Sequence, residues 1–317
     1  MKVRFWGVRG SLPTPLTAAE ISEKLVQALQ GAQGVDLGAK EAVQAYVDQL
    51  PLITRGTVGG NTPCVEVCTP AQQIILDAGS GLRPLGEAMM AGPCGRGEGQ
   101  VHLLLSHLHW DHIQGLPYFS PAYVRGNRIT IHSAHPGFDR QLVLQQSSPH
   151  YPVPLERMGA TFEFNLLQPG QRLRLGDCEI DIITQHHPDT SHSCRIGDGR
   201  SVVVYATDAE YRDLGQESLQ RYVDFFSRAD ALIFDAQYSV RDALFEKDGW
   251  GHSTAFVGID LAAQAGARRL ILFHHEPTYN DQALADLLQT AQVYRDQDPQ
   301  PVALEIVLAY EGLELVL

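Results

Sequence analysis

The stretch Ser106–His112 reads SHLHWDH and places three histidines and an aspartate within six positions, 107–112. The whole chain of 317 residues contains only 13 histidines, so this concentration of imidazoles needs a physical reason. The apolar run Val101–Leu105 comes directly before it and has the length and residue types of a buried strand. The histidines therefore emerge where a strand ends and a loop begins, which is a common location for functional sites.

The spacing of these side chains suits metal binding. His107 and His109 stand at positions i and i+2 and can converge on one ion, whereas Asp111 and His112 extend beyond them toward a second. Neutral imidazole and carboxylate are the ligands of Zn²⁺ and of its relatives Mn²⁺ and Fe²⁺. Four ligand-type residues in H-x-H-x-D-H order rarely arise by chance, so the stretch predicts a metal site.

The rest of the chain predicts many short strands with helices between some of them. Apolar, β-branched runs bounded by Gly, Pro, Asp or Asn predict strands over 3–8, 64–68, 74–76, 101–105, 128–132, 179–184, 201–206, 231–234, 270–273 and 305–308. Helical patterns cover 17–30, 39–50, 217–228, 253–265 and 281–294, with Ser253 and Asp281 as N-caps. Because strand pairs are interrupted by helices without strict alternation, we expect an α/β fold in four layers, helix–sheet–sheet–helix.

No composition shift forces a division of the chain, so we expect a single domain over 1–317. Residues at about 17–51 form a helical insertion between an early strand and the glycine-rich turn Thr57–Thr62. This insertion could act as a lid over a site or could be peripheral.

Composition narrows the class of partner. Lys and Arg number 24 against 37 Asp and Glu, and the formal net charge of −13 comes without a long basic run, which disfavours nucleic acid as a partner. The N-terminus lacks the apolar core of a signal peptide, and no stretch approaches the ~20 apolar residues that span a bilayer. We therefore expect a soluble, cytoplasmic protein without membrane contact, and a homodimer is compatible with the sequence.

The five cysteines do not indicate a disulfide framework or a zinc knuckle. Their number is odd and none of them forms a C-x-x-C pair. We expect free and mostly buried thiols.

The H-x-H-x-D-H stretch after an apolar strand resembles the signature of the metallo-β-lactamase superfamily, and further motifs of that family follow in order. The segment IILDAGSG places Asp77 where the family has a structural aspartate that braces the metal loop. His187 in TQHHPD matches the next ligand better than His186 does. Asp208 ends VVYATD and matches the aspartate shared by both metals, and comparison with the family pattern favours His274 over His275 in LILFHHEP.

The resemblance implies two divalent metal ions, Zn²⁺ first, with Mn²⁺ or Fe²⁺ as alternatives. One ion would be held by His107, His109 and His187, and the second by Asp111, His112 and His274, with Asp208 shared between them. Two ions ~3.5 to 4 Å apart can hold a hydroxide between them at neutral pH, because a metal lowers the pKa of its bound water to about 7. Such a cleft favours an anionic substrate despite the acidic surface of the protein.

Ligand identity separates branches of the superfamily. Di-iron oxidoreductases of this fold resemble H-x-E-x-D-H, whereas this chain has His109 at the glutamate position. Zinc β-lactamases commonly lack the histidine that corresponds to His112. The pattern is that of the phosphodiesterase and nuclease branches, and also of thioester hydrolases.

Two further stretches resemble enzymes that act on phosphodiesters. GWGHST at 249–254 resembles a segment of the tRNA 3′-processing endonucleases (tRNase Z), which implies that His252 is a proton donor or a phosphate contact; an exposed residue at a helix entry is the alternative. FWGVRGS, GGNTPCVEV and SHLHWDHIQGLPYF resemble a bacterial subgroup described as cyclic-nucleotide or phosphoribosyl cyclic phosphodiesterase-like. Asn61 and Thr62 would then touch a phosphate, although turn formation explains them almost as well.

The chain departs from that subgroup after His187. The usual H-P-G-G-x-x-G-Y-R is replaced by HPDTSHSCR, so that Asp189, His192 and Cys194 stand where residues would border the substrate. His192 is a candidate phosphate contact or an exposed loop histidine. The departure concerns substrate identity and leaves the metal ligands intact.

These features lead to one expected function and two alternatives. We expect a metal-dependent hydrolase that cleaves a small anionic phosphodiester, such as a cyclic nucleotide, by a hydroxide bridging two metal ions, with Asp111, Asp208 and His252 as catalytic residues. The first alternative is a thioester or lactone hydrolase of the same fold. The second is a metal-binding accessory protein without catalytic activity.

Overall fold

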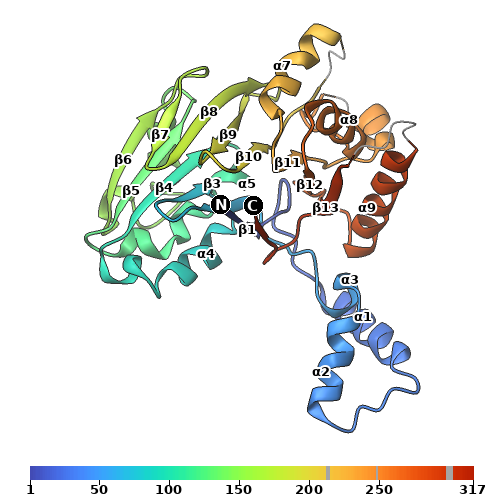
Figure 1. The fold of residues 1–317 in the computed structure, drawn as a ribbon. Coiled ribbons are helices and arrows are strands. Elements are labelled where there is room, and N and C mark those ends of the chain that lie inside the picture. Colours follow the sequence, from blue (N-terminus) through green and yellow to red (C-terminus); the bar gives the residue numbers. More distant parts are fainter. Residues whose placement is uncertain (212–214, 248, 298–302) are drawn as a thin grey trace.

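Two β-sheets packed face to face form the centre of the molecule, with helices on both outer faces (Figure 1). This computed structural model describes residues 1–211, 215–247, 249–297 and 303–317. The four-layer α/β sandwich predicted from the sequence is therefore confirmed.

The first sheet has seven strands in the order β14-β1-β2-β3-β4-β5-β6. They are β1 (Lys2–Gly7), β2 (Cys64–Cys68), β3 (Gln73–Leu76), β4 (Gln100–Leu105), β5 (Arg128–Ser133), β6 (Thr161–Leu166) and β14 (Glu314–Val316). Strands β3 to β6 run parallel, and the pairs on the other side of β3 are antiparallel. The metal-binding stretch SHLHWDH leaves the sheet at the carboxyl end of β4.

The second sheet also has seven strands, in the order β13-β12-β11-β10-β9-β8-β7. They are β7 (Leu173–Leu175), β8 (Cys178–Gln185), β9 (Ser191–Gly197), β10 (Val202–Ala206), β11 (Ala231–Asp235), β12 (Arg269–Phe273) and β13 (Glu305–Leu308). Strands β10 to β13 are parallel, whereas β7, β8, β9 and β10 pair antiparallel. Asp208 and His274 follow the ends of β10 and β12.

Helices cover the outer faces of both sheets. The first sheet is covered by α4 (Leu82–Met89) and α6 (Phe138–Gln145), with α5 (Trp110–Ile113) at its edge, and the second by α7 (Gln216–Phe226), α8 (Ala255–Ala265) and α9 (Asp281–Asp296). Short 3-10 turns occupy 93–96, 116–118, 120–123 and 155–157, and a π-helical turn occupies Asp242–Glu246.

The two predicted N-caps are wrong by one residue each. Thr254 caps α8 by accepting from Val257 N–H, and Asn280 caps α9 by accepting from Ala283 N–H. Capping needs a side-chain oxygen one residue before the first helical turn, and in both places two suitable residues stand side by side.

The hydrophobic core lies between the sheets, with a second cluster between the first sheet and its helices. Strand β1 shows the expected alternation, since Val3 and Phe5 are fully buried while their neighbours are partly exposed. Central strands such as β11 are buried on both faces, which explains their continuous apolar sequence ALIFD. The five cysteines are free, as predicted, and four of them are buried.

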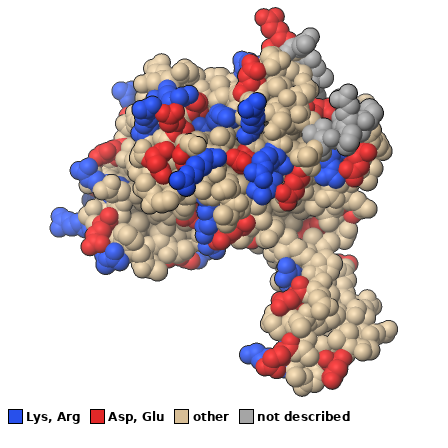
Figure 2. Space-filling model, viewed as in Figure 1, with Lys and Arg blue, Asp and Glu red and all other residues tan. Residues whose placement is uncertain are grey.

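A helical arm projects from the sandwich near the N-terminus (Figure 1). It consists of α1 (Ala18–Gly31), α2 (Lys40–Gln49) and α3 (Leu52–Arg55), and it corresponds to the segment predicted as an insertion at about 17–51. No residue of these three fully described helices is buried, and Figure 2 shows few charged side chains on the visible face of the arm.

A partly buried ion pair ties the arm to the sandwich. Lys24 Nζ lies 2.7 Å from Asp281 Oδ2 at the start of α9, and Asp281 Oδ1 accepts from Val58 N–H. The arm is thus anchored at its base, and a role as a lid stays a prediction. Among the described residues, no helix is both long enough and apolar enough to cross a membrane.

Candidate metal centre

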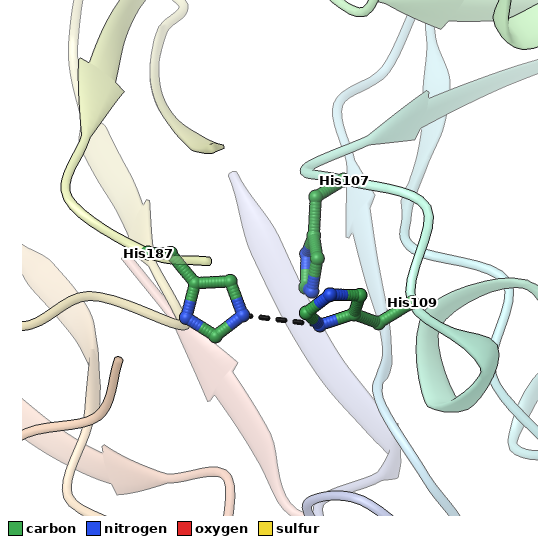
Figure 3. A group of neighbouring side chains, drawn as sticks. All are labelled: His107, His109 and His187. Carbon is green, nitrogen blue, oxygen red and sulfur yellow. Dashed lines mark hydrogen bonds between the residues drawn. The ribbon is translucent and has the colours of Figure 1, made fainter. Parts of the chain in front are cut away.

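Three histidines meet at the edge where strands of the two sheets end (Figure 3). His107 and His109 come from the loop after β4, and His187 comes from the loop after β8. His187 Nε2 lies 3.1 Å from His109 Nδ1, and the His107 ring centroid is 4.9 Å from that of His187. One nitrogen from each ring lies within 4.8 Å of the others, so the three could hold one ion.

A second group of four buried ligands lies beside the first. His112 Nε2 and His274 Nε2 face each other at 3.2 Å, and Asp111 Oδ2 is 3.2 Å and 3.1 Å from them. Asp208 Oδ1 lies 3.2 Å from His112 Nε2 and 3.3 Å from His274 Nε2. These atoms also fall within 4.8 Å of one another.

Asp208 stands between the two groups. Its Oδ1 faces His112 and His274, while its Oδ2 lies 3.6 Å from His107 Nε2 and 3.8 Å from His187 Nε2. One carboxylate therefore points one oxygen at each group, which is the position expected of a ligand shared by two ions. The structure brings all seven predicted ligands together.

Three of the ligand imidazoles, those of His112, His187 and His274, have their outer nitrogens already occupied. His112 Nδ1 donates to Asp77 at 2.8 Å, His187 Nδ1 donates to the Gly251 carbonyl at 2.8 Å, and His274 Nδ1 donates to Gln237 Oε1 at 2.9 Å. Each bond leaves the Nε2 lone pair directed into the centre, as in protein metal sites.

One further nitrogen supports this fit. His107 Nε2 is buried and has no hydrogen-bond partner in the part of the chain that the structure describes. A buried nitrogen without a partner is costly, and a cation would satisfy it. The residues present therefore fit a pair of divalent cations.

Asp77 braces the loop that carries the ligands. It is fully buried, and it accepts from Ser106 N–H at 2.7 Å, from Tyr205 O–H at 2.7 Å and from His112. Its φ of 60° is uncommon for a non-glycine residue, and strain of this kind persists only where the surroundings impose it. Asp77 thus links β3, β4 and the second sheet.

The protonation of the centre follows from its burial and its charges. Burial would raise the pKa of Asp208, but the imidazoles of His112 and His274 hold it well below its usual range. Burial would lower the pKa of His112, but Asp208 and Asp111 raise it well above the usual value. Burial lowers the pKa of His107 and of His109. A cation at the centre would compete with a proton on His112.

His252 lies against both groups but is bonded to a different carboxylate. Its Nδ1 donates to Asp235 Oδ2 at 2.8 Å, and its ring centroid is 5.1 Å from His187 and 5.0 Å from His274. Burial alone would lower the pKa of His252, yet the fully buried Asp235 raises it above the usual value. The pair places an imidazole with a raised pKa beside the candidate metal ligands.

Asn61 and Thr62, two of the residues predicted to contact substrate, are already hydrogen-bonded within the protein. Asn61 donates to Glu311 Oε2 at 3.0 Å, and Thr62 is fully buried with its Oγ1 accepting from Ser80 N–H and from Gln114. Contact with a phosphate would require these bonds to break, so it stays a prediction for both residues.

His192 is buried on β9 rather than exposed in a loop. Its backbone N–H donates to the Ser106 carbonyl at 3.0 Å, and its Nδ1 lies 3.3 Å from the same oxygen. Contact between His192 and substrate stays a prediction.

Asp235 and Gln237 were not selected from the sequence, although both support the centre. They follow the apolar strand β11 in LIFDAQ, which is the same pattern of polar residues after a buried strand that drew attention to His107. The signal was present but lacked the histidines that make a ligand set conspicuous.

Comparisons with known proteins identify the family. A model of the β-lactamase superfamily domain matches residues 72–275. Ribonuclease Z of Bradyrhizobium diazoefficiens is 24% identical over 290 residues, covering 74% of this chain and 89% of that protein.

Solved structures show the same fold. The metallo-β-lactamase fold protein YhfI from Bacillus subtilis matches with a TM-score of 0.64 at 19% identity, covering 99% of this chain and 98% of that one. A diphosphatase from the PhnP family matches with a TM-score of 0.60 at 17% identity, covering 100% of this chain and 97% of that one. The chain belongs to the β-lactamase superfamily and is a metallo-β-lactamase fold hydrolase related to ribonuclease Z.

Proposed function

We propose that this hydrolase uses two divalent cations to cleave a small phosphodiester, with a cyclic nucleotide as one candidate substrate. The observation that carries the proposal is the carboxylate of Asp208, whose two oxygens face two separate groups of ligands. One group contains His107, His109 and His187, and the other contains Asp111, His112 and His274.

The residues suit Zn²⁺ first and accept Mn²⁺ or Fe²⁺, since imidazole and carboxylate bind all three. When bound, two such cations supply an activated water at neutral pH and positive charge for a phosphate group. Asp111 and Asp208 orient their carboxylates toward the ligand histidines and offset part of that charge.

His252 supplies the proton that a departing alkoxide needs. Asp235 holds the imidazole by Nδ1, which leaves Nε2–H for the substrate. Asp235 raises the pKa of His252, which favours the protonated ring that a general acid requires. The leaving group of a thioester is a thiolate, which needs protonation by an acid less than an alkoxide does. The His252–Asp235 pair therefore favours a phosphodiester.

The substrate we propose is small and anionic. Ribonuclease Z and a diphosphatase are among the similar proteins, and both names refer to substrates that contain phosphate. The net charge of −13 disfavours a long nucleic acid, although a short or cyclic nucleotide needs only the local positive charge of a metal-loaded centre. Cytoplasmic location and a homodimer stay predictions.

A side-by-side assay tests this function. The protein is stripped of metal, restored with Zn²⁺ or Mn²⁺, and given bis(p-nitrophenyl) phosphate, cyclic nucleotides and a thioester. We expect turnover of phosphodiesters that is lost in Asp208→Ala. Turnover of the thioester alone would select the alternative hydrolase, and no turnover with two ions bound would indicate an accessory protein.

A further inference from the structure

The helical arm carries a concentration of exposed apolar side chains. Among the described residues, 18 large apolar side chains are exposed, and six of them belong to the arm, at Ile21, Leu25, Val26, Leu29, Val35 and Val43. The segment 17–51 holds only 35 of the 317 residues, so a small part of the chain carries a third of these side chains. A concentration of this kind marks an interaction surface, whereas scattered exposed apolar residues are ordinary.

Four of these residues line one side of α1. Ile21, Leu25 and Leu29 are spaced four residues apart, which brings them onto one face of the helix, and Val26 flanks Leu25. Their exposed fractions lie between 49% for Ile21 and 70% for Leu29. We call these four residues the α1 stripe.

The arm is attached to the sandwich by a different side of α1. Lys24 pairs with Asp281 at the start of α9 and donates to the Ile53 carbonyl. Helix α1 packs against α3, and α3 packs against α9. The link 32–39 between α1 and α2 lies at the tip of the arm, away from the sandwich (Figure 1). The α1 stripe therefore stays exposed after the arm has been anchored.

The helices of the arm lack the packing that normally stabilises helices. Helix α1 has 14 residues, and neither it nor α2 or α3 contains a buried residue. Helices of this length are marginal in water on their own, and in proteins most of their stability comes from packing of an apolar face. A second surface against the α1 stripe would supply that packing.

The α1 stripe is complementary to itself. Leu25 stands midway between Ile21 and Leu29. If two α1 helices pack antiparallel about a two-fold axis at Leu25, Ile21 of each copy meets Leu29 of the other, and the two Leu25 side chains meet at the axis. A two-fold contact needs a surface that matches itself in this way.

The charges of the arm suit the same arrangement. Both glutamates of α1, Glu20 and Glu23, precede Leu25, whereas residues 25–35 carry no charge. Antiparallel pairing sets the acidic half of each helix against the neutral half of the other, and it brings opposite ends of the two helix dipoles together. Five acidic residues against two lysines give 17–51 a net charge of −3, which disfavours an anionic membrane or a nucleic acid as the occupant.

We propose that the α1 stripe binds a second copy of this chain in an antiparallel, two-fold contact between α1 helices. Helix α1 is ~21 Å long, so this contact is smaller than the ~800 Å² per partner of a standard interface. The dimer is therefore reversible, with a Kd on the order of 10 μM. Because α1 runs from the sandwich toward the tip of the arm, antiparallel pairing places the two sandwiches at opposite ends of the helix pair (Figure 1).

Sedimentation velocity tests the dimer on the full chain with Zn²⁺ present. We expect a reversible change from monomer to dimer between about 1 μM and about 200 μM. Leu25→Glu keeps a good helix former at a side chain that is 60% exposed, and it sets two carboxylates against each other at the axis. Its Kd should rise ~10-fold or more. The control Val293→Glu makes the same change at an exposed position on α9 and should keep the wild-type Kd.

Chemical cross-linking tests the geometry without a disruptive charge. With a short bis-maleimide, Leu25→Cys should form a covalent dimer with itself, because this residue lies at the axis. An equimolar mixture of Ile21→Cys and Leu29→Cys should form more covalent dimer than either variant alone. Wild type is the reagent control, since its five cysteines are free and four of them are buried.

Each result bears on the α1 stripe and none depends on the proposed hydrolase activity. A protein that is still monomeric at about 200 μM would overturn the proposal. A dimer that Leu25→Glu and Val293→Glu weaken equally, or that neither weakens, would lie on another surface and would overturn it as well. If Ile21→Cys links to itself as readily as to Leu29→Cys, the antiparallel contact is wrong.

Discussion

At the scale of single residues, the centre depends on the atoms that hold each imidazole from outside. His274 illustrates this, because its Nδ1 donates to Gln237 Oε1, whose amide nitrogen in turn donates to Glu276 Oε2 at 3.0 Å. Lys247 Nζ lies 2.8 Å from the same Glu276 oxygen. This buried chain sets the tautomer of His274 and therefore directs its Nε2 toward Asp111.

Gln237→Ala should weaken metal binding without removing a ligand. Loss of the acceptor frees the His274 ring to adopt the other tautomer, and changes to such supporting residues typically cost about 10- to 100-fold in metal affinity. Competition with a chromophoric chelator measures the affinity. Gln146→Ala removes another buried glutamine, which is bonded to the Val153 carbonyl. It should lower the stability of the protein and leave the metal affinity unchanged. Equal losses of metal affinity in both variants would contradict the role of Gln237.

Asp235→Asn should shift the pH dependence of turnover. Asp235 raises the pKa of His252 against the effect of burial, so its removal should lower that pKa. A general acid works only when protonated, and activity falls as pH rises through its pKa. The alkaline limb of the kcat profile should therefore move to lower pH in Asp235→Asn, while His252→Ala should reduce kcat by about 10²-fold or more and abolish that limb.

Metal analysis of the same variants supplies the control. His252 and Asp235 lie outside the seven proposed ligands, so the metal content of both variants should match the wild type. A fall in kcat that merely follows lost metal would contradict the general-acid assignment.

The residues that the sequence revealed are those with conspicuous chemistry. His107, His109, Asp111 and His112 were found because they are crowded together, and the other ligands were found through resemblance to a family. Asp235 and Gln237 were not found, because a single polar residue after a strand gives no sign of what it faces. Strand pairing within the second sheet places them beside the metal ligands, since Asp235 pairs with Phe273, the residue before His274.

At the scale of secondary-structure elements, the strands that the sequence predicts are those buried on both faces and those whose side chains alternate between buried and exposed. All ten predicted strands exist, with boundaries within two residues. Strands β6, β7, β9 and β14 were missed. Strand β6 has no buried residue, and β9 carries His, Ser and Cys in place of β-branched residues, so neither shows an apolar run. Their pairing depends on neighbouring strands, which local sequence does not encode.

Strands β4, β5 and β6 carry a polar row that should make stability depend on pH. His132 Nδ1 accepts from the Asn165 amide at 3.0 Å, and its Nε2 lies 3.1 Å from His102 Nδ1. Burial, with His102 beside it, lowers the pKa of His132 to about 4. The unfolded chain, with a pKa of ~6.5, takes up the proton first, so folding stability should fall as pH drops from about 6.5 to about 4.

His132→Gln should remove this loss, because glutamine keeps the polar contacts and does not titrate. The difference between the two pKa values corresponds to a loss of unfolding free energy of about 3 kcal/mol at most, and roughly half of this loss should appear between pH 7 and pH 5. Urea unfolding at the two pH values measures it in wild type and variant. His150→Gln changes an exposed histidine and should keep the wild-type pH dependence. An unchanged pH dependence in His132→Gln would show that other groups control acid stability.

At the scale of the whole molecule, the candidate metal centre joins charged groups from both sheets. His107, His109, Asp111 and His112 belong to the first sheet, whereas His187, Asp208 and His274 belong to the second. Asp77 adds a hydrogen-bonded link, since its carboxylate accepts from Tyr205 O–H on the opposite sheet. Cations held by both sets of ligands would therefore couple the halves of the sandwich as well as serve the chemistry.

Removal of metal should therefore lower the stability of the entire fold. A ligand that binds only the native state adds about 2.7 kcal/mol when its free concentration is 100 times its Kd, and two ions add two such contributions. We expect the Tm of the protein to fall by several degrees after chelation and to recover when Zn²⁺ is returned, as followed by scanning calorimetry. Asp208→Ala removes the carboxylate that faces both groups, so its Tm should respond far less to Zn²⁺. If wild type and Asp208→Ala gained the same Tm from Zn²⁺, the ions would be binding elsewhere, because a site that spans both sheets cannot stabilise the fold equally without its shared ligand.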